Sequence, residues 1–324
     1  MNLPPEFIST IQNTYGERGH VFLKALPDLI AEASARWELT DVVPAPTLSY
    51  NFVAYAKCPS PVGRWRSEGQ SEGGDVVLKI GVPNDEMRSE MAALRLFNGE
   101  GACRLLDYDE ERCWMLLERL HPGVMLSTLE DDEESTRIAV GVMKRIWISG
   151  FDTPSTIAQG YSTSDSYSKF IQLTDWFDGL KKLREMFNGG TGPLDGKLVE
   201  RVESSVKDFF TENHHPVLMH GDFHHYNVLS SERGWLVIDP KGVIGPAGYE
   251  VGPFMLNPWN KFSDGISRPL MERRIDILHE HLGFERQRII EWSLAHAILS
   301  AWWGIEDNTG WEYAMEMAEV IATL

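Results

Sequence analysis

Residues 217–229 read VLMHGDFHHYNVL, residues 236–242 read LVIDPKG, and these two stretches decide the fold. Apolar runs flank a polar insert that holds Asp222 and Asn227 five residues apart, and a second acid, Asp239, ends the next apolar run. Phosphoryl transfer uses such a set. One carboxylate accepts the proton of a substrate hydroxyl group, and an amide oxygen with a second carboxylate holds Mg²⁺ against nucleotide phosphates. Because Mg²⁺ keeps several water ligands, two protein oxygens suffice.

Two other interpretations of this segment compete with the first. Asp and Asn also stabilise tight turns through their own backbone, so the acids and the amide need no chemical role on their own. His220 and His224 stand four residues apart, as zinc ligands of a helical HExxH motif do. However, Gly221 disfavours a helix here, and no Glu follows His220, so the zinc interpretation is the weaker one.

A lysine and a glutamate upstream fit the phosphoryl-transfer interpretation. In residues 76–80, VVLKI, strand alternation places Val76, Leu78 and Ile80 on one face and Lys79 on the other. A helix is expected over residues 83–97, with Asn84 as its N-cap and Gly99 as its stop, and it carries Glu90. A buried Lys79 would need an anionic partner, and Glu90 is one helical element away. The alternative is an ordinary surface ion pair.

The rest of the chain divides into a strand-rich part and a helical part. Helical periodicity predicts a helix over residues 20–37, and β-branched or aromatic runs predict strands over 48–56, 75–80, 104–108 and 113–117. Later segments have helical periodicity: 131–148, 166–187, 196–210, 268–282 and 286–305. We therefore expect an α+β protein with a small antiparallel-sheet lobe over residues 1–120, including a helical extension over 1–40, and a larger, mostly helical lobe over 121–324.

Composition narrows the partners. The 324 residues include 30 Lys and Arg against 48 Asp and Glu, a formal charge of −18, which disfavours nucleic acid and anionic membranes and suits a cationic small molecule. Cys58, Cys103 and Cys113 cannot form an even disulfide framework. The N-terminus has no signal-peptide pattern, and the most apolar stretch, residues 289–305, is too short and too polar for a membrane span. We expect a cytoplasmic protein that is a monomer or a homodimer.

The motif His220-Gly221-Asp222-x₄-Asn227, joined to Ile238-Asp239, resembles the aminoglycoside phosphotransferase superfamily, whose members have a bilobal, protein-kinase-like fold. Residues 238–242 (IDPKG), 249–252 (YEVG) and 257–258 (NP) look most like the branch named for streptomycin 6-kinases and hydroxyurea kinases. Early and late segments, around Trp37 and residues 299–303, also look like that branch. The resemblance thus covers nearly the whole chain.

The resemblance implies roles for the residues above. Asp222 matches the catalytic aspartate, and Asn227 and Asp239 match the two ligands of Mg²⁺. Lys79 matches the strand lysine that contacts the nucleotide phosphates, and Glu90 matches the helix glutamate that orients it. By the same resemblance, His220 braces the catalytic loop.

The nucleotide-binding elements are implied in the same way. The linker 116–120 matches the hinge whose backbone bonds the nucleobase, and its predicted contacts are Leu117, Glu118 and Leu120. Ser49 and Asn51 stand where kinases carry a Gly-rich loop over the phosphates, but residues 48–53 contain no glycine. The phosphoryl donor is expected to be ATP or GTP, bound between the two lobes. A P-loop is absent from the sequence, since its nearest match around Gly196 lacks both the first Gly and the final Ser or Thr.

The expected acceptor is a hydroxyl-bearing small molecule such as an aminoglycoside, and the formal charge of −18 favours a cationic one. Lys241 either touches a phosphate or the substrate, or is a solvated turn residue. Glu306 and Asp307 either hold cationic groups of the substrate or form a charged helix end in water. The Trp302-Trp303 pair fits a core better than a sugar-binding platform. Alternative acceptors are an amino sugar, a choline-like amine or hydroxyurea. A different alternative is that the protein binds a nucleotide but is catalytically silent.

Overall fold

A computed structural model describes residues 3–59, 74–149, 169–211, 216–262, 265 and 267–324. The chain divides into two compact units, unit 1 over Met1–His121 and unit 2 over Pro122–Leu324. Residues 60–73, between the strands expected over 48–56 and 75–80, lie outside the described residues, and so does the start of the helix expected over 166–187.

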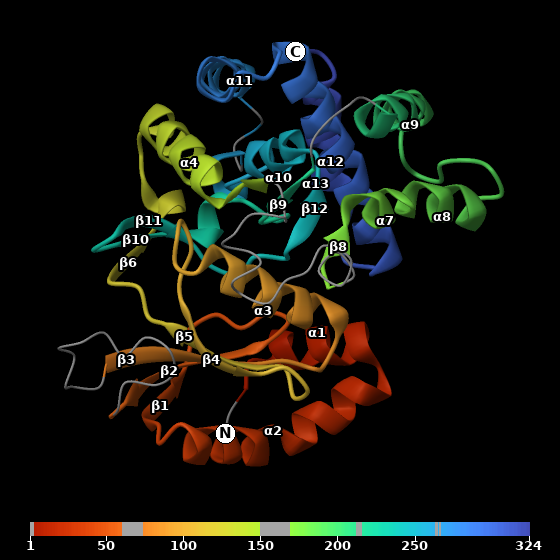
Figure 1. The fold of residues 1–324 in the computed structure, drawn as a ribbon. Helices are drawn as coiled ribbons and strands as arrows, with labels where there is room; N and C mark the ends of the chain where they lie inside the picture. The colour runs from red at the N-terminus through yellow and green to blue at the C-terminus, as the bar shows by residue number, and fades with distance from the viewer. Residues whose placement is uncertain (1–2, 60–73, 150–168, 212–215, 263–264, 266) are drawn as a thin grey trace. The chain divides into compact units, whose positions relative to one another are not determined.

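Unit 1 is a five-stranded antiparallel sheet with helices on both faces (Figure 1). Its strand order is β1-β2-β3-β5-β4. The bounds are α1 Pro5–Tyr15, α2 Glu17–Arg36, β1 Thr40–Pro44, β2 Phe52–Cys58, β3 Gly74–Ile80, α3 Asp85–Phe97, β4 Leu105–Asp109 and β5 Trp114–Glu118. The N-terminal helix expected over 20–37 is α2, and it is preceded by a second helix, α1, that periodicity did not reveal.

The two faces of β3 have different neighbours. Val76, Leu78 and Ile80 are buried in one hydrophobic core with residues of α1 and α2, including Phe7 and Leu26. Lys79 points to the opposite face, where α3 supplies its partner. The expected alternation is therefore confirmed, and it sends the lysine to the α3 face of the sheet.

Two expectations for unit 1 need correction. The strand expected over 48–56 begins only at Phe52, because residues 45–51 form the connection from β1, which the sequence analysis did not identify. The left-handed stop of α3 is Asn98, with φ +49°, and Gly99 follows it. Asn tolerates this conformation because its short polar side chain bonds locally. The expected N-cap is confirmed, since Asn84 Oδ1 accepts a 2.8 Å hydrogen bond from the Met87 amide.

Unit 2 combines two small sheets with a larger set of helices (Figure 1). The sheets have the orders β11-β10-β6 and β7-β9-β12-β8. The strands are β6 Pro122–Met125, β7 Ile148–Ser149, β8 Ile171–Gln172, β9 Val217–Met219, β10 Val228–Ser231, β11 Gly234–Val237 and β12 Val243–Gly245. The α-helices are α4 Asp132–Ile146, α7 Leu173–Phe177, α8 Gly179–Met186, α9 Gly196–Thr211, α10 Val251–Met255, α11 Arg268–Leu282, α12 Arg286–Glu306 and α13 Glu312–Ile321. Short 3₁₀ turns are η2 Leu126–Thr128, η3 His225–Asn227, η4 Ala247–Glu250 and η5 Trp259–Phe262.

Helix α12 forms the centre of the unit 2 core. Most of its residues are buried, and it packs against α9, α10, α11 and α13. A helix that is apolar nearly all round must be covered on every side, which explains why so many helices surround it. Trp302 is buried in this core as expected, whereas Trp303 is only half-buried. Within the described residues, none of the helices combines the length and apolar character needed to cross a membrane.

Candidate active site

The predicted catalytic loop, residues 220–227, connects β9 to β10 in unit 2. Its second residue, Gly221, has φ +86°, a conformation that costs an L-residue with a side chain about 1–2 kcal/mol. A Cβ atom at Gly221 would also lie 2.3 Å from Cγ2 of Val243 on β12. Glycine is therefore required twice over at this position, by its backbone conformation and by the space available.

The buried carboxylate of Glu250 fixes the start of this loop. Its two oxygens accept hydrogen bonds of 2.8 Å each from the backbone N–H groups of His220 and Gly221. Burial raises the pKa of Glu250 to about 7, although these two hydrogen bonds favour the ionised form. Glu250 belongs to the YEVG segment that carries the family resemblance, but no role was predicted for it.

His220 braces the loop, as the resemblance implied. Its Nδ1 lies 3.1 Å from the Asp222 amide and its Nε2 lies 2.9 Å from the Ile238 carbonyl oxygen. An amide can only donate, so Nδ1 accepts and Nε2 carries the proton that is donated to Ile238. Burial lowers the pKa of His220 to about 4, which keeps the ring neutral. The ring therefore joins the two stretches that carry Asp222 and Asp239.

Asp222 and Asn227 lie at the two ends of the loop and are linked to each other. The Asn227 amide nitrogen donates to the Asp222 carbonyl oxygen at 3.1 Å and lies 3.3 Å from His224 Nε2. His224 Nε2 is also 3.6 Å from the Asp222 carboxylate. Burial alone would raise the pKa of Asp222, but interactions with His224 and Lys241 outweigh it and lower the pKa below its ordinary value. Asp222 is therefore ionised at neutral pH.

The donor set fits a hard cation. Because the Asn227 nitrogen is used within the loop, the side-chain atom left for a metal is Oδ1. The nearby Asp239 carboxylate opposes this lowering of the pKa of Asp222, because the two negative charges repel each other. A divalent cation relieves such repulsion, and amide and carboxylate oxygens are the ligands that Mg²⁺ prefers.

Asp239 itself has a strained backbone, with φ +59°. A non-glycine residue in this region costs free energy and is often found at functional sites. Lys241, two residues later, lies 4.0 Å from the Asp239 carboxylate, and its amide donates to the His220 carbonyl oxygen at 2.7 Å. Lys241 thus lies beside the predicted metal ligand, and its backbone is hydrogen-bonded to the first residue of the predicted catalytic loop.

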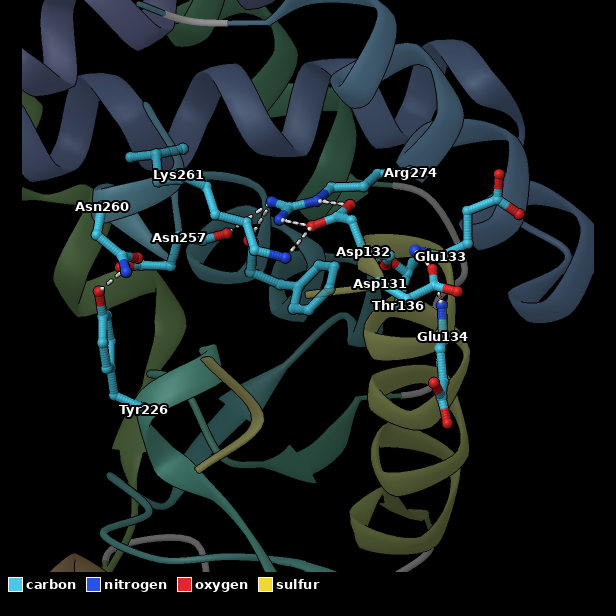
Figure 2. Close-up of polar contacts among 12 residues, drawn as sticks. Asp131, Asp132, Glu133, Glu134, Thr136, Tyr226, Asn257, Asn260, Lys261 and Arg274 are labelled. Atoms are coloured by element: carbon cyan, nitrogen blue, oxygen red, sulfur yellow. Dashed lines mark hydrogen bonds and ion pairs between the residues drawn. The ribbon is translucent and has the colours of Figure 1, made fainter. Parts of the chain in front are cut away.

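A buried ion pair anchors the far side of the loop (Figure 2). The guanidinium group of Arg274, on α11, bonds both oxygens of Asp132, on α4, at 2.6 and 2.8 Å, and donates to the Asn257 carbonyl oxygen at 2.6 Å. Lys261 adds a third hydrogen bond to Asp132, at 3.2 Å. Arg274 is fully buried. Residues 254–262 are thereby held between α4 and α11.

The anchored segment contacts the end of the catalytic loop at two points. The Phe254 ring stacks on His225, with 4.3 Å between ring centroids and 14° between planes. The Tyr226 hydroxyl group donates to Asn260 Oδ1 at 3.2 Å, as Figure 2 also shows. Both contacts involve residues just before Asn227, so this segment supports the 3₁₀ turn that carries the predicted metal ligand.

In unit 1, the predicted Lys79–Glu90 pair is present and buried. Lys79 Nζ lies 2.7 Å from each oxygen of Glu90, and the two side chains are 6% and 5% exposed. The surface alternative is therefore wrong. Such a pair holds an ammonium group in one place, which is the preorganisation that binding phosphates requires.

The other predicted nucleotide contacts lie in unit 1 as well. Ser49 is exposed in the β1–β2 connection, and Asn51 ends that connection. The Asn51 Oδ1 atom would be 2.3 Å from a Cβ atom at Gly81, so the missing side chain of Gly81 makes room for it. The predicted hinge, with Leu117, Glu118 and Leu120, closes β5 and continues to the end of the unit. The Glu118 amide already donates to the Arg104 carbonyl oxygen at 2.9 Å.

The predicted C-terminal substrate contacts end α12. Glu306 lies 3.3 Å from Lys182 Nζ, and both side chains are exposed. Burial and the neighbouring Glu306 raise the pKa of Asp307. A cavity of about 940 Å³ lies elsewhere, over α7, α8 and α9, and none of the residues predicted for the site lines it.

Comparison with known proteins shows the family and the fold of the chain. The family model "Aminoglycoside/hydroxyurea antibiotic resistance kinase" matches residues 60–308. The chain is 30% identical to the streptomycin 6-kinase of Streptomyces griseus over 95% of this chain and 92% of that one. It is 40% identical to the streptomycin 3″-kinase of Klebsiella pneumoniae over 72% and 80%. Its fold is similar to that of the choline kinase LicA from Streptococcus pneumoniae, with a TM-score of 0.60, 13% identity, and 92% and 99% of the two chains covered. The expected protein-kinase-like α+β fold is thus confirmed.

Proposed function

The chain belongs to the aminoglycoside/hydroxyurea antibiotic resistance kinase family, and we propose that it phosphorylates a hydroxyl group of streptomycin or a related cationic aminoglycoside, with ATP as the donor. One observation carries the proposal. Asp222, which is ionised, lies in one loop with Asn227. Hydrogen bonds to Glu250 and His220 fix the backbone of this loop. Two relatives, both streptomycin kinases, support streptomycin as the acceptor. The formal charge of −18 suits a cationic acceptor.

Each residue then has a defined task. Asp222 accepts the proton of the acceptor hydroxyl group while the new oxygen–phosphorus bond forms and the bond to the departing ADP breaks. Lys79, held by Glu90, neutralises charge on the phosphates. Asn227 and Asp239 would hold Mg²⁺, which supplies further charge neutralisation when bound. Positioning does most of the work, because the transition state is loose and a carboxylate is a weak base.

The remaining predicted contacts keep subsidiary roles in this proposal. Ser49 and Asn51 cover the phosphates, and Leu117, Glu118 and Leu120 contact the nucleobase. Lys241 contacts a transferring phosphate, whereas Glu306 and Asp307 contact cationic groups of the acceptor. GTP as the donor, the cytoplasm as the location and a monomer or homodimer as the assembly stay predictions.

The decisive experiment measures ADP release by the purified protein with streptomycin, hydroxyurea and choline, followed by mass spectrometry and NMR of the product. We expect a phosphate on one streptomycin hydroxyl group, and NMR identifies its position. Asp222→Asn should lower kcat by about 10²–10⁴ while ATP still binds. Asp208→Asn, on the exposed side of α9, is the matched control and should be fully active. No transfer to streptomycin, or an undiminished Asp222→Asn variant, would refute the proposal.

A further inference from the structure

Four aromatic rings form a closed set in unit 2. They are Trp176 on α7, Tyr249 on η4, and His296 and Trp303 on α12. Neighbouring ring centroids are 5.8 Å apart for Trp176–Tyr249, 5.5 Å for Tyr249–His296, 6.1 Å for His296–Trp303 and 5.4 Å for Trp303–Trp176. These steeply inclined contacts are favourable for aromatic pairs. The four-ring cluster therefore holds His296 in one orientation.

The four-ring cluster borders the catalytic aspartate. A Cβ atom at Gly221 would lie 3.2 Å from the Trp176 ring, so this ring packs directly against the residue before Asp222. The charge of Asp222 also acts on Tyr249 and on His296. The acceptor must reach the Asp222 carboxylate, so side chains around it are candidates for contact with the acceptor.

The hydroxyl group of Tyr249 sets the tautomer of His296. It lies 2.9 Å from Nδ1. Tyr249 is fully buried, and burial raises its pKa well above the ordinary value, so the hydroxyl group stays protonated. Among the described residues its one hydrogen-bond partner is His296 Nδ1, so the buried O–H group is satisfied by donating a hydrogen bond to Nδ1. Burial lowers the pKa of His296 to about 4, so the ring is neutral and its one proton is on Nε2.

That Nε2–H group has no use within the protein. His296 is only 7% exposed, and among the described residues none forms a hydrogen bond with Nε2. Nε2 itself is not fully inaccessible, so water can still reach this atom. A polar group that reaches solvent but has no partner among the described residues is available to a ligand, and the interaction of His296 with the charge of Asp222 places it in the neighbourhood of the predicted catalytic acid.

We propose that His296 binds the phosphoryl acceptor, with its Nε2–H group donating a hydrogen bond to an acceptor oxygen close to the hydroxyl group that faces Asp222. The proposal rests on the proposed function and adds the recognition of a polyhydroxylated acceptor. The half-buried Trp176 and Trp303 complete the rigid wall from which this donor projects. A bound acceptor without an oxygen at that position would exclude water from the Nε2–H group without replacing the lost hydrogen bond.

Two substitutions separate the donor from the packing. His296→Phe keeps a ring but removes the donor, and we expect the KM for streptomycin to rise about tenfold, with the KM for ATP unchanged. His296→Gln places an amide N–H near the position of Nε2, and we expect its KM for streptomycin to stay within about threefold of the wild type. An active wild type together with a folded His296→Phe variant of unchanged KM would overturn the inference.

A second measurement needs no activity. Long-range ¹H–¹⁵N NMR of the imidazole ring should report the Nε2–H tautomer in the free protein and a shift of that resonance when streptomycin is added. The Nδ1–H tautomer, or no response to bound streptomycin, would contradict the inference. A wild type that transfers phosphate to no acceptor would instead refute the proposed function, so the two failures are distinguishable.

Discussion

The Glu250 carboxylate accepts a 2.8 Å hydrogen bond from the Gly221 amide and, through its other oxygen, one from the His220 amide, so one buried side chain fixes the backbone before the predicted catalytic aspartate. Glu250→Gln keeps only one acceptor oxygen and places an NH₂ group against a backbone donor. We expect kcat to fall about tenfold, because the lost hydrogen bond and the contact between two donors displace the loop. A tenfold fall corresponds to about 1.4 kcal/mol of activation free energy. An unchanged kcat would contradict this role.

The same side chain makes stability depend on pH. The folded-state pKa of Glu250 is raised from 4.5 to about 7, so its contribution is largest below pH 4.5 and is lost as the pH rises through about 7. The shift corresponds to about 3 kcal/mol. Chemical denaturation at several pH values measures the free energy of unfolding of the wild type and of Glu250→Gln. As the pH rises from below 4.5 to above 7, the stability of the wild type relative to the variant should fall by this amount. A difference independent of pH would be contrary evidence.

Gly221→Ala tests the two constraints on the catalytic loop. The new Cβ adds a clash with Val243 to the cost of a positive φ, so we expect a larger loss of stability than from strain alone, and loss of activity. Gly234→Ala is the matched control, since Gly234 has φ +91° with nothing within 4 Å of a Cβ. It should cost about 1 kcal/mol in denaturant unfolding and leave kcat unchanged. Equal effects of both substitutions would exclude the clash.

Lys79→Ala leaves the buried Glu90 carboxylate without this partner. We expect a loss of about 3–5 kcal/mol in the free energy of unfolding and a higher KM for ATP. Arg88→Ala on the same helix removes an exposed ion pair with Asp85 and should change the unfolding midpoint little. If the two variants unfold alike, the buried pair does not have the proposed importance.

Arg274→Met tests the anchor beneath the turn that carries Asn227. Asp132 would then keep Lys261 as its charged partner from residues 254–262. We expect the free energy of unfolding to fall by about 3–5 kcal/mol. We also expect half-maximal activity to require a higher Mg²⁺ concentration. The neighbouring Arg273 pairs with Glu133 at the surface, so Arg273→Ala is the control and should behave as the wild type. Thermal unfolding and Mg²⁺ titration of ADP release measure both effects.

The sequence predicted what short-range patterns can encode. Alternation in β3 placed Lys79 on its face, and the Asn84 N-cap signal gave the start of α3. It did not predict β1, whose five residues are mostly exposed and carry a weak pattern, or Tyr249, Trp176 and His296 as neighbours. Periodicity shows which face of an element is apolar, but not which distant element covers it. Glu250 was detectable only as a charged residue at the edge of an apolar segment.

The close approach of Asn51 to Gly81 also constrains how this family can diverge. A larger residue at position 81 would displace the Asn51 side chain, which is predicted to cover the nucleotide phosphates. The two positions should therefore change together among relatives: a bulkier residue at one is tolerated only with a shorter residue at the other. A natural repertoire in which they vary independently would mean that the backbone between β1 and β2 moves to compensate.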